Sequence, residues 1–252
     1  MLPSRRVRAP AATIIAPPFP REMTWLNVAP LRMDKQRGRP VLIEFWDFCR
    51  VNSLRTLPYV KAWHERYAAD GLRVVSVHAG GFLPARDEAN VRRAVERLEI
   101  EHPVAIDARL ELWDAYGNEG WPARYLFDRG GALFSMHYGE GAYAETEREI
   151  QELLGVEREL LSPLRPEDEE GVLLPAPTPD RPGAYCGPYE AGGVWAVLEG
   201  DGAVEANGRR VGVREPRAYP LVEHERHTAG VLELRVGDGV TCHATCFTPG
   251  RA

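Results

Sequence analysis

Lysine and long apolar runs are scarce in this sequence. Arginine outnumbers lysine by 29 to 2, the net charge is -6, and charges of both signs are mixed along the chain. No basic stripe therefore indicates binding to nucleic acid or to an anionic membrane surface. Residues 1–18 contain basic side chains and one short apolar run broken by prolines, which is too short to span a membrane. We predict a globular chain with soluble partners and no membrane or nucleic acid contact.

Cysteine is scarce as well, with four residues in the chain and no pair at Cys-x-x-Cys spacing. The N-terminus also lacks the longer apolar core of a secretory signal. A chain with few cysteines and no export signal is expected in the reducing cytoplasm, where thiols do not form a disulfide framework. We therefore predict a cytoplasmic protein.

No Gly-rich phosphate loop, zincin motif or nucleophile elbow occurs in the sequence. Four residues of metal-binding type lie in the C-terminal part, namely Cys186, Cys242, His243 and Cys246. In a regular strand over 240–247, however, the last two cysteines share a face about 13 Å apart. That separation is too large for one zinc ion or one disulfide. We predict no metal and no cofactor, and leave open a disulfide between Cys186 and one of the other two.

The most informative stretch is an apolar strand over 41–46 that leads into a helix starting near residue 52. It ends in Phe45-Trp46, and the helix reads Leu-Arg-Thr-Leu-Pro up to Pro58. This segment resembles the active site of the TlpA-like branch of the thioredoxin family (redoxin domain). Counting from either flank places that family's two cysteines at Arg50 and Ser53. The resemblance therefore implies a degenerate active site without the redox disulfide.

The rest of the first part alternates strands and helices. We expect strands over 41–46, 72–78, 103–106, 120–128 and 132–138, and helices over 52–69, 87–99, 110–116 and 143–155. This alternation predicts a mainly parallel sheet with one hairpin. Its order matches thioredoxin, so we predict an α/β thioredoxin-like domain over 23–161, after a surface tail over 1–22.

A polar, proline-punctuated stretch over 162–183 predicts a linker. Short apolar runs separated by Gly-Asp-Gly and Asn-Gly turns follow, which predicts a small all-β domain over 184–252, an antiparallel sandwich or barrel. Its segments 215–222 and 232–235 resemble the β domain of DipZ-type TlpA-like proteins, which looks like a carbohydrate-binding module. The domain is shorter here, and sugar binding is left open.

Cys49 meets half of the requirements of thioredoxin chemistry, which needs a thiolate at a helix N-terminus and a second, resolving thiol. Arg50 would lower its pKa, whereas Glu44 and Asp47 would raise it. One interpretation is a one-cysteine site that attacks a disulfide, a peroxide or an electrophile. The other is a small, half-buried structural residue.

Two further residues have both a chemical and a structural interpretation. Glu44 occupies the position of the family's buried proton-transferring acid, and we expect it to bond Ser53 or to pair with Arg50. His78 ends its strand at the carboxyl edge of the sheet. It is either a base for Cys49 or a histidine that caps a loop.

The dipeptide Trp121-Pro122 matches the family's cis-proline site, at which the backbone pairs with a bound substrate strand. The resemblance implies that Pro122 is cis and that Trp121 covers a peptide-sized groove, with Trp46 nearby.

Our leading hypothesis is a thioredoxin-like protein with a degenerate site, at most a one-cysteine thiol-disulfide oxidoreductase or peroxidase-like enzyme acting through Cys49 on a protein or peptide thiol. The alternative is a non-enzymatic binding or assembly protein with a stable protein partner, held at the cis-proline groove or by the β domain. A third hypothesis is that Arg50, at the helix start, binds an anionic substrate. The sequence does not predict an oligomeric state.

Overall fold

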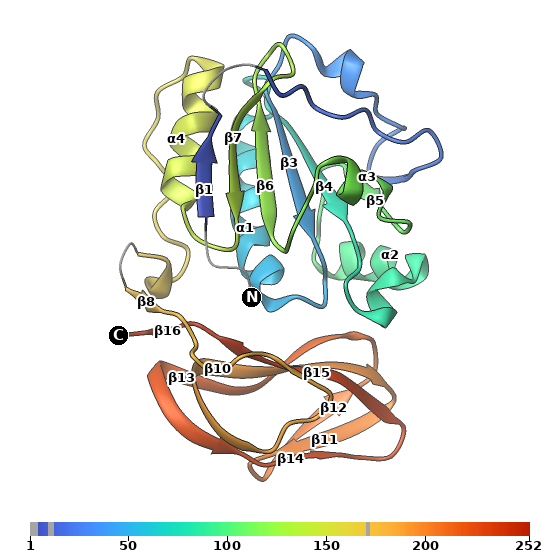
Figure 1. The fold of residues 1–252 in the computed structure, drawn as a ribbon, viewed down its shortest axis with the longest axis vertical. Coiled ribbons are helices and arrows are strands. Elements are labelled where there is room, and N and C mark those ends of the chain that lie inside the picture. The colour runs from blue at the N-terminus through green and yellow to red at the C-terminus, as the bar shows by residue number, and fades with distance from the viewer. Residues whose placement is uncertain (1–4, 10–12, 170–171) are drawn as a thin grey trace. The chain divides into compact units, whose positions relative to one another are not determined.

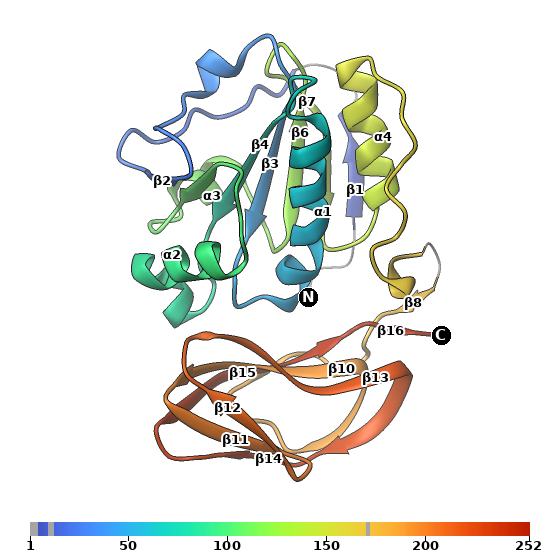
Figure 2. The ribbon, with the colours of Figure 1, turned by 180° about the vertical axis from the view of Figure 1, so that it is seen from behind.

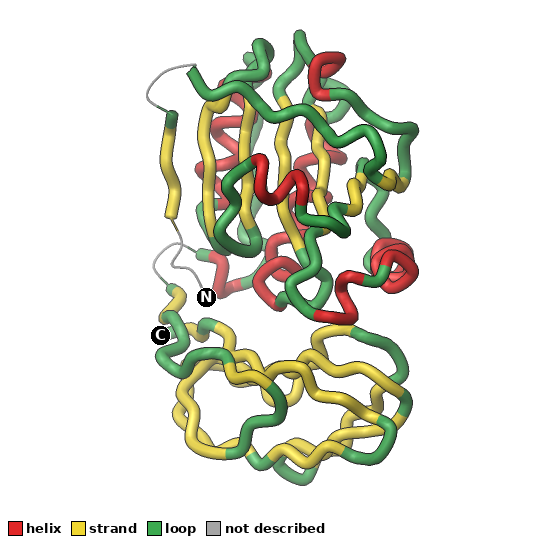
Figure 3. Tube along the Cα trace, turned by 45° about the vertical axis from the view of Figure 1, so that its right-hand side comes forward, coloured by secondary structure: helices red, strands yellow, loops and turns green. Residues whose placement is uncertain are grey.

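The computed structural model describes residues 5–9, 13–169 and 172–252. The chain divides between Ser162 and Pro163 into two compact units. The first unit combines helices and strands, whereas the described part of the second unit consists of strands joined by loops, with one short 3₁₀ helix (Figure 3).

A seven-stranded sheet forms the centre of the first unit, with the strand order β1-β7-β6-β3-β4-β5-β2 (Figure 1). Its strands are β1 (Arg5–Arg8), β2 (Thr24–Leu26), β3 (Val41–Trp46), β4 (Arg73–His78), β5 (Val104–Ile106), β6 (Ala123–Phe127) and β7 (Leu133–Tyr138). The α-helices are α1 (Val51–Tyr67), α2 (Glu88–Arg97), α3 (Glu111–Ala115) and α4 (Tyr143–Leu154), and the 3₁₀ helices are η1 (Met33–Gln36) and η2 (Leu83–Arg86).

The sheet is mixed, so the prediction of a mainly parallel sheet is wrong. Strands β3, β4 and β5 run parallel, whereas β6, β7, β1 and β2 each join antiparallel to a neighbour. The predicted surface tail contributes strand β1, which pairs with β7. Strands of three or four residues such as β1 and β2 are too short to show the alternation that identifies a strand in a sequence.

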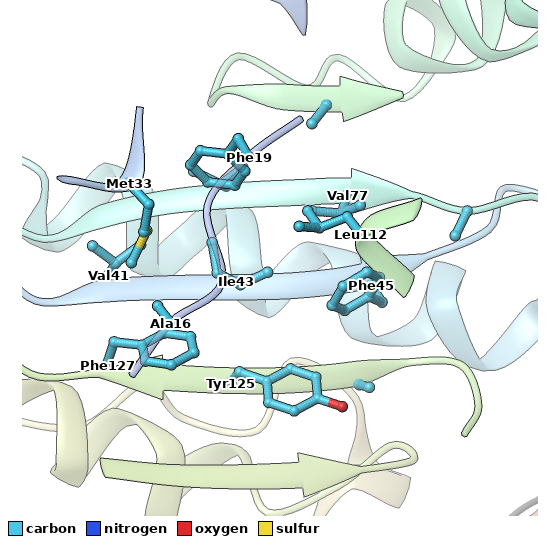
Figure 4. Packing of buried hydrophobic residues seen from close by; sticks show 14 of the residues in the cluster. Ala16, Phe19, Met33, Val41, Ile43, Phe45, Val77, Leu112, Tyr125 and Phe127 are labelled. Atoms are coloured by element: carbon cyan, nitrogen blue, oxygen red, sulfur yellow. The ribbon is translucent and has the colours of Figure 1, made fainter. Parts of the chain in front are cut away.

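The two faces of the sheet are covered by two apolar cores. Ile43 and Phe45 of β3 pack against Leu112 of α3 and Phe19 of the N-terminal segment (Figure 4). Leu42 faces the opposite side and packs against α1 and α4, which Figure 2 shows in front of the sheet. Strand β3 is therefore buried on both faces, as its continuous apolar run predicts.

The second unit is all-β, which confirms the predicted class. A four-stranded sheet, β13-β10-β15-β9, and a three-stranded sheet, β12-β11-β14, share one apolar core, and β16 pairs with β8. The strands are β8 (Leu173–Leu174), β9 (Arg181–Pro182), β10 (Gly187–Gly200), β11 (Gly202–Ala206), β12 (Arg209–Val213), β13 (Arg217–Leu232), β14 (Leu234–Val236), β15 (Val240–Thr248) and β16 (Gly250–Arg251), after the 3₁₀ helix η3 (Pro166–Asp168). Because β8 and β9 belong to these sheets, much of the stretch predicted as a linker is part of the second unit.

Candidate functional site

The predicted site residues of the first unit gather at one edge of its sheet. Strands β3 and β4 are parallel and pair up to Trp46 and His78, so the loops that follow them leave from the same edge. The dipeptide Trp121-Pro122 lies at this edge too, because the next residue, Ala123, pairs with Phe45 near the end of β3. This is the edge at which helix N-termini and binding sites occur in open α/β folds.

Asp47 holds the two loops together. Its side chain is completely buried, and its two carboxylate oxygens accept the backbone N–H groups of Cys49 at 2.7 Å and Gly81 at 2.8 Å. Burial raises the pKa of Asp47, and these hydrogen bonds, with one from Phe82, oppose that rise. From the sequence, Asp47 counted only as a charge near the thiol. Its position directly after a buried strand is the signal for this structural role.

Cys49 lies where the sequence predicts it, one residue before the residue that caps α1. Its side chain is 0% exposed, so it is not half-buried, as the structural interpretation assumed. None of the four cysteines is in a disulfide, and the other three belong to the second unit. A thiol must be reachable by its target to act as a nucleophile, and burial opposes that here.

Arg50 is held between two aromatic rings. Its guanidinium carbon lies 4.5 Å from the ring centroid of Phe82 and 4.6 Å from that of Trp121, distances at which cation–π attraction operates. Gly81 makes room for this arrangement, because a Cβ atom there would lie 2.9 Å from Arg50 Nη2 and 3.0 Å from Trp121 Cη2. We call Arg50, Phe82, Trp121 and Gly81 the Arg50 clamp. The sequence indicated Arg50 and Trp121 but gave no signal for Phe82 or Gly81.

The Trp121–Pro122 peptide bond is cis, as the resemblance implies. Trp121 is fixed from two sides, since Nε1 donates to the carbonyl oxygen of Ala79 at 2.8 Å and the ring packs on Trp113 with centroids 4.2 Å apart. Trp46 does not line this surface. It is completely buried, so the prediction of a substrate-binding Trp46 is wrong.

His78 is buried against two aromatic rings and the backbone. Its Nε2 accepts the N–H of Phe48 at 3.3 Å, and its ring stacks on Phe48 and meets the edge of Trp46. Burial lowers the pKa of His78 to about 3. Because its acceptor nitrogen is engaged and only weakly basic, His78 is suited to capping this loop and not to deprotonating Cys49.

Glu44 is completely buried beneath α1 and bonds residues that the sequence did not indicate. Its Oε2 accepts the hydroxyl of Ser76 at 2.8 Å, and the Ser76 oxygen lies 2.7 Å from His102 Nε2. Burial raises the pKa of Glu44 to about 7, while Ser76 and Arg124, its partner on β6, act in the opposite direction.

The expected partners of Glu44 were therefore wrong. Ser53 accepts the backbone N–H of Asp47 at 3.3 Å, and Arg50 lies in the clamp. Both depart from the prediction because strand register gives Glu44 its neighbours on β4 and β6, and Arg50, the residue before α1, contacts Phe82 in the loop after β4.

The metal-type residues of the second unit bond their neighbours in the sheets. Cys186 Sγ lies 3.3 Å from the carbonyl oxygen of Leu234, and His243 Nε2 lies 2.9 Å from Glu199 Oε2. Within the described ranges, no group of three or more His, Cys, Asp or Glu side chains could hold a metal ion. No described helix combines the length and the apolar character that crossing a bilayer requires.

The strand order, with α1 after β3 and a cis-proline before β6, defines the first unit as a thioredoxin fold. A solved structure of a thioredoxin-like protein in its oxidised form superposes with a TM-score of 0.51 and 27% identity, over 58% of this chain and 99% of that protein. No family model matches the chain. The thiol-disulfide oxidoreductase YkuV of Bacillus subtilis is 28% identical over 138 residues, 55% of this chain and 93% of YkuV.

Protein DipZ of Mycobacterium bovis is 35% identical over 191 residues, 72% of this chain and 26% of DipZ. These similarities confirm the resemblance to the thioredoxin-fold redoxin family. It spans about a quarter of the length of DipZ. Because 72% of the chain is more than the first unit holds, the similarity continues into the second unit. Relatives named thiol-disulfide oxidoreductases connect the family with thiol redox chemistry at a general level.

Proposed function

We propose that the first unit is a thioredoxin-fold binding module, which holds a segment of a partner protein beside the Arg50 clamp and does not exchange disulfides. The observation that carries the proposal is that Arg50, at the position expected for the family's attacking cysteine, is fixed between Phe82 and Trp121, while Cys49 is completely buried.

Disulfide exchange needs an accessible thiolate and a second thiol that resolves the mixed disulfide. The chain has no Cys-x-x-Cys pair, and Ser53 has no sulfur with which to resolve an adduct. The same edge is suited to binding, because Phe82 and Trp121 are partly exposed and the next residue, Leu83, is 71% exposed. Exposed apolar and aromatic side chains in one place are typical of protein-binding surfaces.

A second candidate function is one-cysteine thiol chemistry through Cys49. It is supported by the position of Cys49 near the start of α1, because a helix N-terminus stabilises a thiolate. This function requires the loop over 47–50 to open, because the side chain of Cys49 is 0% exposed. For both functions, a protein partner and the cytoplasm remain our predictions.

Alkylation by iodoacetamide separates the two functions. In the native protein we expect the exposed Cys186 to react at least 100-fold faster than Cys49, with Cys49 reacting only when the first unit unfolds. Mass spectrometry of peptides measures both rates. Fast labelling of native Cys49, together with thiol-disulfide exchange that the Cys49→Ser variant lacks, would establish the thiol function in place of the binding function.

Leu83→Ser tests the binding function directly, because Leu83 is exposed and its loss leaves the core intact. We expect it to weaken retention of capped octapeptides from a random library by about tenfold, as loss of an apolar anchor does. Ile14→Ser removes another exposed apolar side chain of the first unit and is the matched control. Equal loss in both variants, or no retention by the parent chain, would reject the binding module.

A further inference from the structure

We infer that Arg50 makes this surface selective for acidic residues, so that the ligand is a protein segment presenting an Asp or Glu side chain next to an apolar one. The inference rests on the proposed binding function and adds the chemistry of the ligand.

The guanidinium of Arg50 has no counter-charge of its own. Over the residues that the structure describes, Arg50 forms no ion pair and its side chain donates no hydrogen bond, and its Nε is buried without a partner. Polar hydrogens removed from water and left unpaired cost free energy. A carboxylate from a ligand would remove that cost, because carboxylates accept two parallel N–H bonds from arginine.

Asp47, a buried carboxylate whose charge interacts with that of Arg50, is engaged elsewhere. Its oxygens accept backbone N–H groups from Cys49 and Gly81, and its charge acts on Arg50 only from outside ion-pair distance. Asp47 therefore fixes the loops around the clamp and leaves the guanidinium without a directly bonded anion.

The clamp prepares Arg50 to receive a carboxylate. Rings on two sides, Phe82 and Trp121, fix the position of the guanidinium, so little side-chain entropy remains to be lost on binding. The start of α1 reinforces the preference. This 17-residue helix has no side-chain cap and no acidic residue in its first turn, so its unpaired N–H groups add to the positive potential at Arg50.

The apolar surroundings favour a protein segment over a small free anion. Leu83 is 71% exposed and adjoins Phe82 of the clamp. A free carboxylate would leave this surface in water, whereas an acidic residue with an apolar neighbour in the same segment would cover both features.

The test uses the full chain and a positional-scanning library of capped octapeptides. Bound peptides are identified by mass spectrometry, and the strongest is compared with its Glu→Gln or Asp→Asn counterpart by fluorescence anisotropy. We expect enrichment of Asp and Glu at one position beside an apolar residue, and about tenfold weaker binding of the amide counterpart. Arg50→Gln should make the two peptides bind equally.

Arg86→Gln is the matched control. It removes an equal charge from an exposed side chain on η2 that donates to the carbonyl oxygen of Gly80 and lies in no clamp. We expect this variant to keep the preference for the acid. Free acetate, which has the carboxylate without the apolar neighbour, should compete only at concentrations far above those of the peptide.

The outcomes separate the two proposals. Equal binding of acid and amide peptides by the parent chain, or an acid preference that survives Arg50→Gln, would reject selectivity by Arg50 and leave the binding module standing. Failure of the whole library to bind would reject both. Displacement of the peptide by acetate at a concentration similar to that of the peptide would show that the site binds a small free anion and is not selective for a protein segment.

Discussion

Glu44 and Arg124 lie directly opposite each other on β3 and β6, and both side chains are buried beneath α1 and α4. The register continues this polar row in both directions, to Ser76 on β4 and to His137 on β7. Arg124 also donates to the carbonyl oxygen of Gly141. The sheet therefore has a row of polar and charged side chains through one of its cores, and the ionisation of that row makes stability depend on pH.

Glu44→Gln should be more stable than the parent chain at pH 8 and lose that advantage near pH 4.5. Burial raises the pKa of Glu44 from 4.5 to about 7. Between these values the folded state holds a proton that the unfolded state releases, so parental stability falls as pH rises through this window. The difference between the two chains should change by on the order of 3 kcal/mol from pH 4.5 to pH 8.

Urea unfolding followed by tryptophan fluorescence measures this change, because five of the six tryptophans belong to the first unit. Glu65→Gln, at an exposed position of α1, is the control and should give a constant difference. If the stability difference between Glu44→Gln and the parent chain is also independent of pH, the Glu44 carboxyl has the same pKa in the folded and unfolded states.

The buried histidines produce the opposite slope at acid pH. Burial lowers the pKa of His78, His102 and His137 to about 3. Between pH 6.5 and 3 these histidines are protonated in the unfolded state but stay neutral in the folded state. The free energy of unfolding therefore falls as pH falls. Each histidine contributes about 1.4 kcal/mol per pH unit inside the window. Three such groups outweigh the single Glu44, so we expect the first unit to unfold on acidification.

His102→Gln tests this directly, since the amide can still bond the Ser76 hydroxyl that His102 Nε2 contacts at 2.7 Å. Between pH 6 and 4, the free energy of unfolding should change less steeply with pH, by the contribution of one histidine, about 1.4 kcal/mol per pH unit. An unchanged slope would mean that His102 is protonated equally in the folded and unfolded states.

The sequence predicted the framework of this site better than its contacts. The apolar run of β3 and the motif around Trp46 and Pro58 were sufficient to locate the helix start, and the cis peptide at Pro122 followed from the resemblance. Arg50's contacts were not predictable, because Phe82 is brought to it by the turn after β4. Arg124 was missed because its partnership with Glu44 depends on strand register, which the residues of either strand alone do not reveal.

Gly81→Ala should disturb the Arg50 clamp. The added Cβ would lie 2.9 Å from Arg50 Nη2, 3.0 Å from Trp121 Cη2 and 3.3 Å from Asp47 Oδ2. The guanidinium and the indole must then move, which we expect to cost about 1–3 kcal/mol in the free energy of unfolding and to shift tryptophan emission. Gly212→Ala, at a position with no atom within 4 Å, is the control. Wild-type emission and stability in Gly81→Ala would show that the clamp tolerates a side chain there.

Tyr219→Phe should destabilise the second unit alone. The Tyr219 hydroxyl donates to the carbonyl oxygen of Glu215 at 2.7 Å and accepts the N–H groups of Arg214 and Glu215 at 3.3 and 3.4 Å. It thereby fixes the turn between β12 and β13, and its ring is buried in the core shared by the two larger sheets. Removing the hydroxyl leaves these backbone groups without that partner, which should cost about 1–2 kcal/mol.

Hydrogen exchange of peptides from β10 and β13, read by mass spectrometry, reports on the second unit, while tryptophan fluorescence reports mainly on the first. We expect faster exchange in the second unit and an unchanged fluorescence transition, because each unit has apolar cores of its own. Tyr189→Phe, which removes a hydroxyl that contacts His224, is the matched control and should have the smaller effect, because it leaves the backbone of that turn bonded. A fluorescence transition that shifts together with the exchange rates would show that the two units unfold as one.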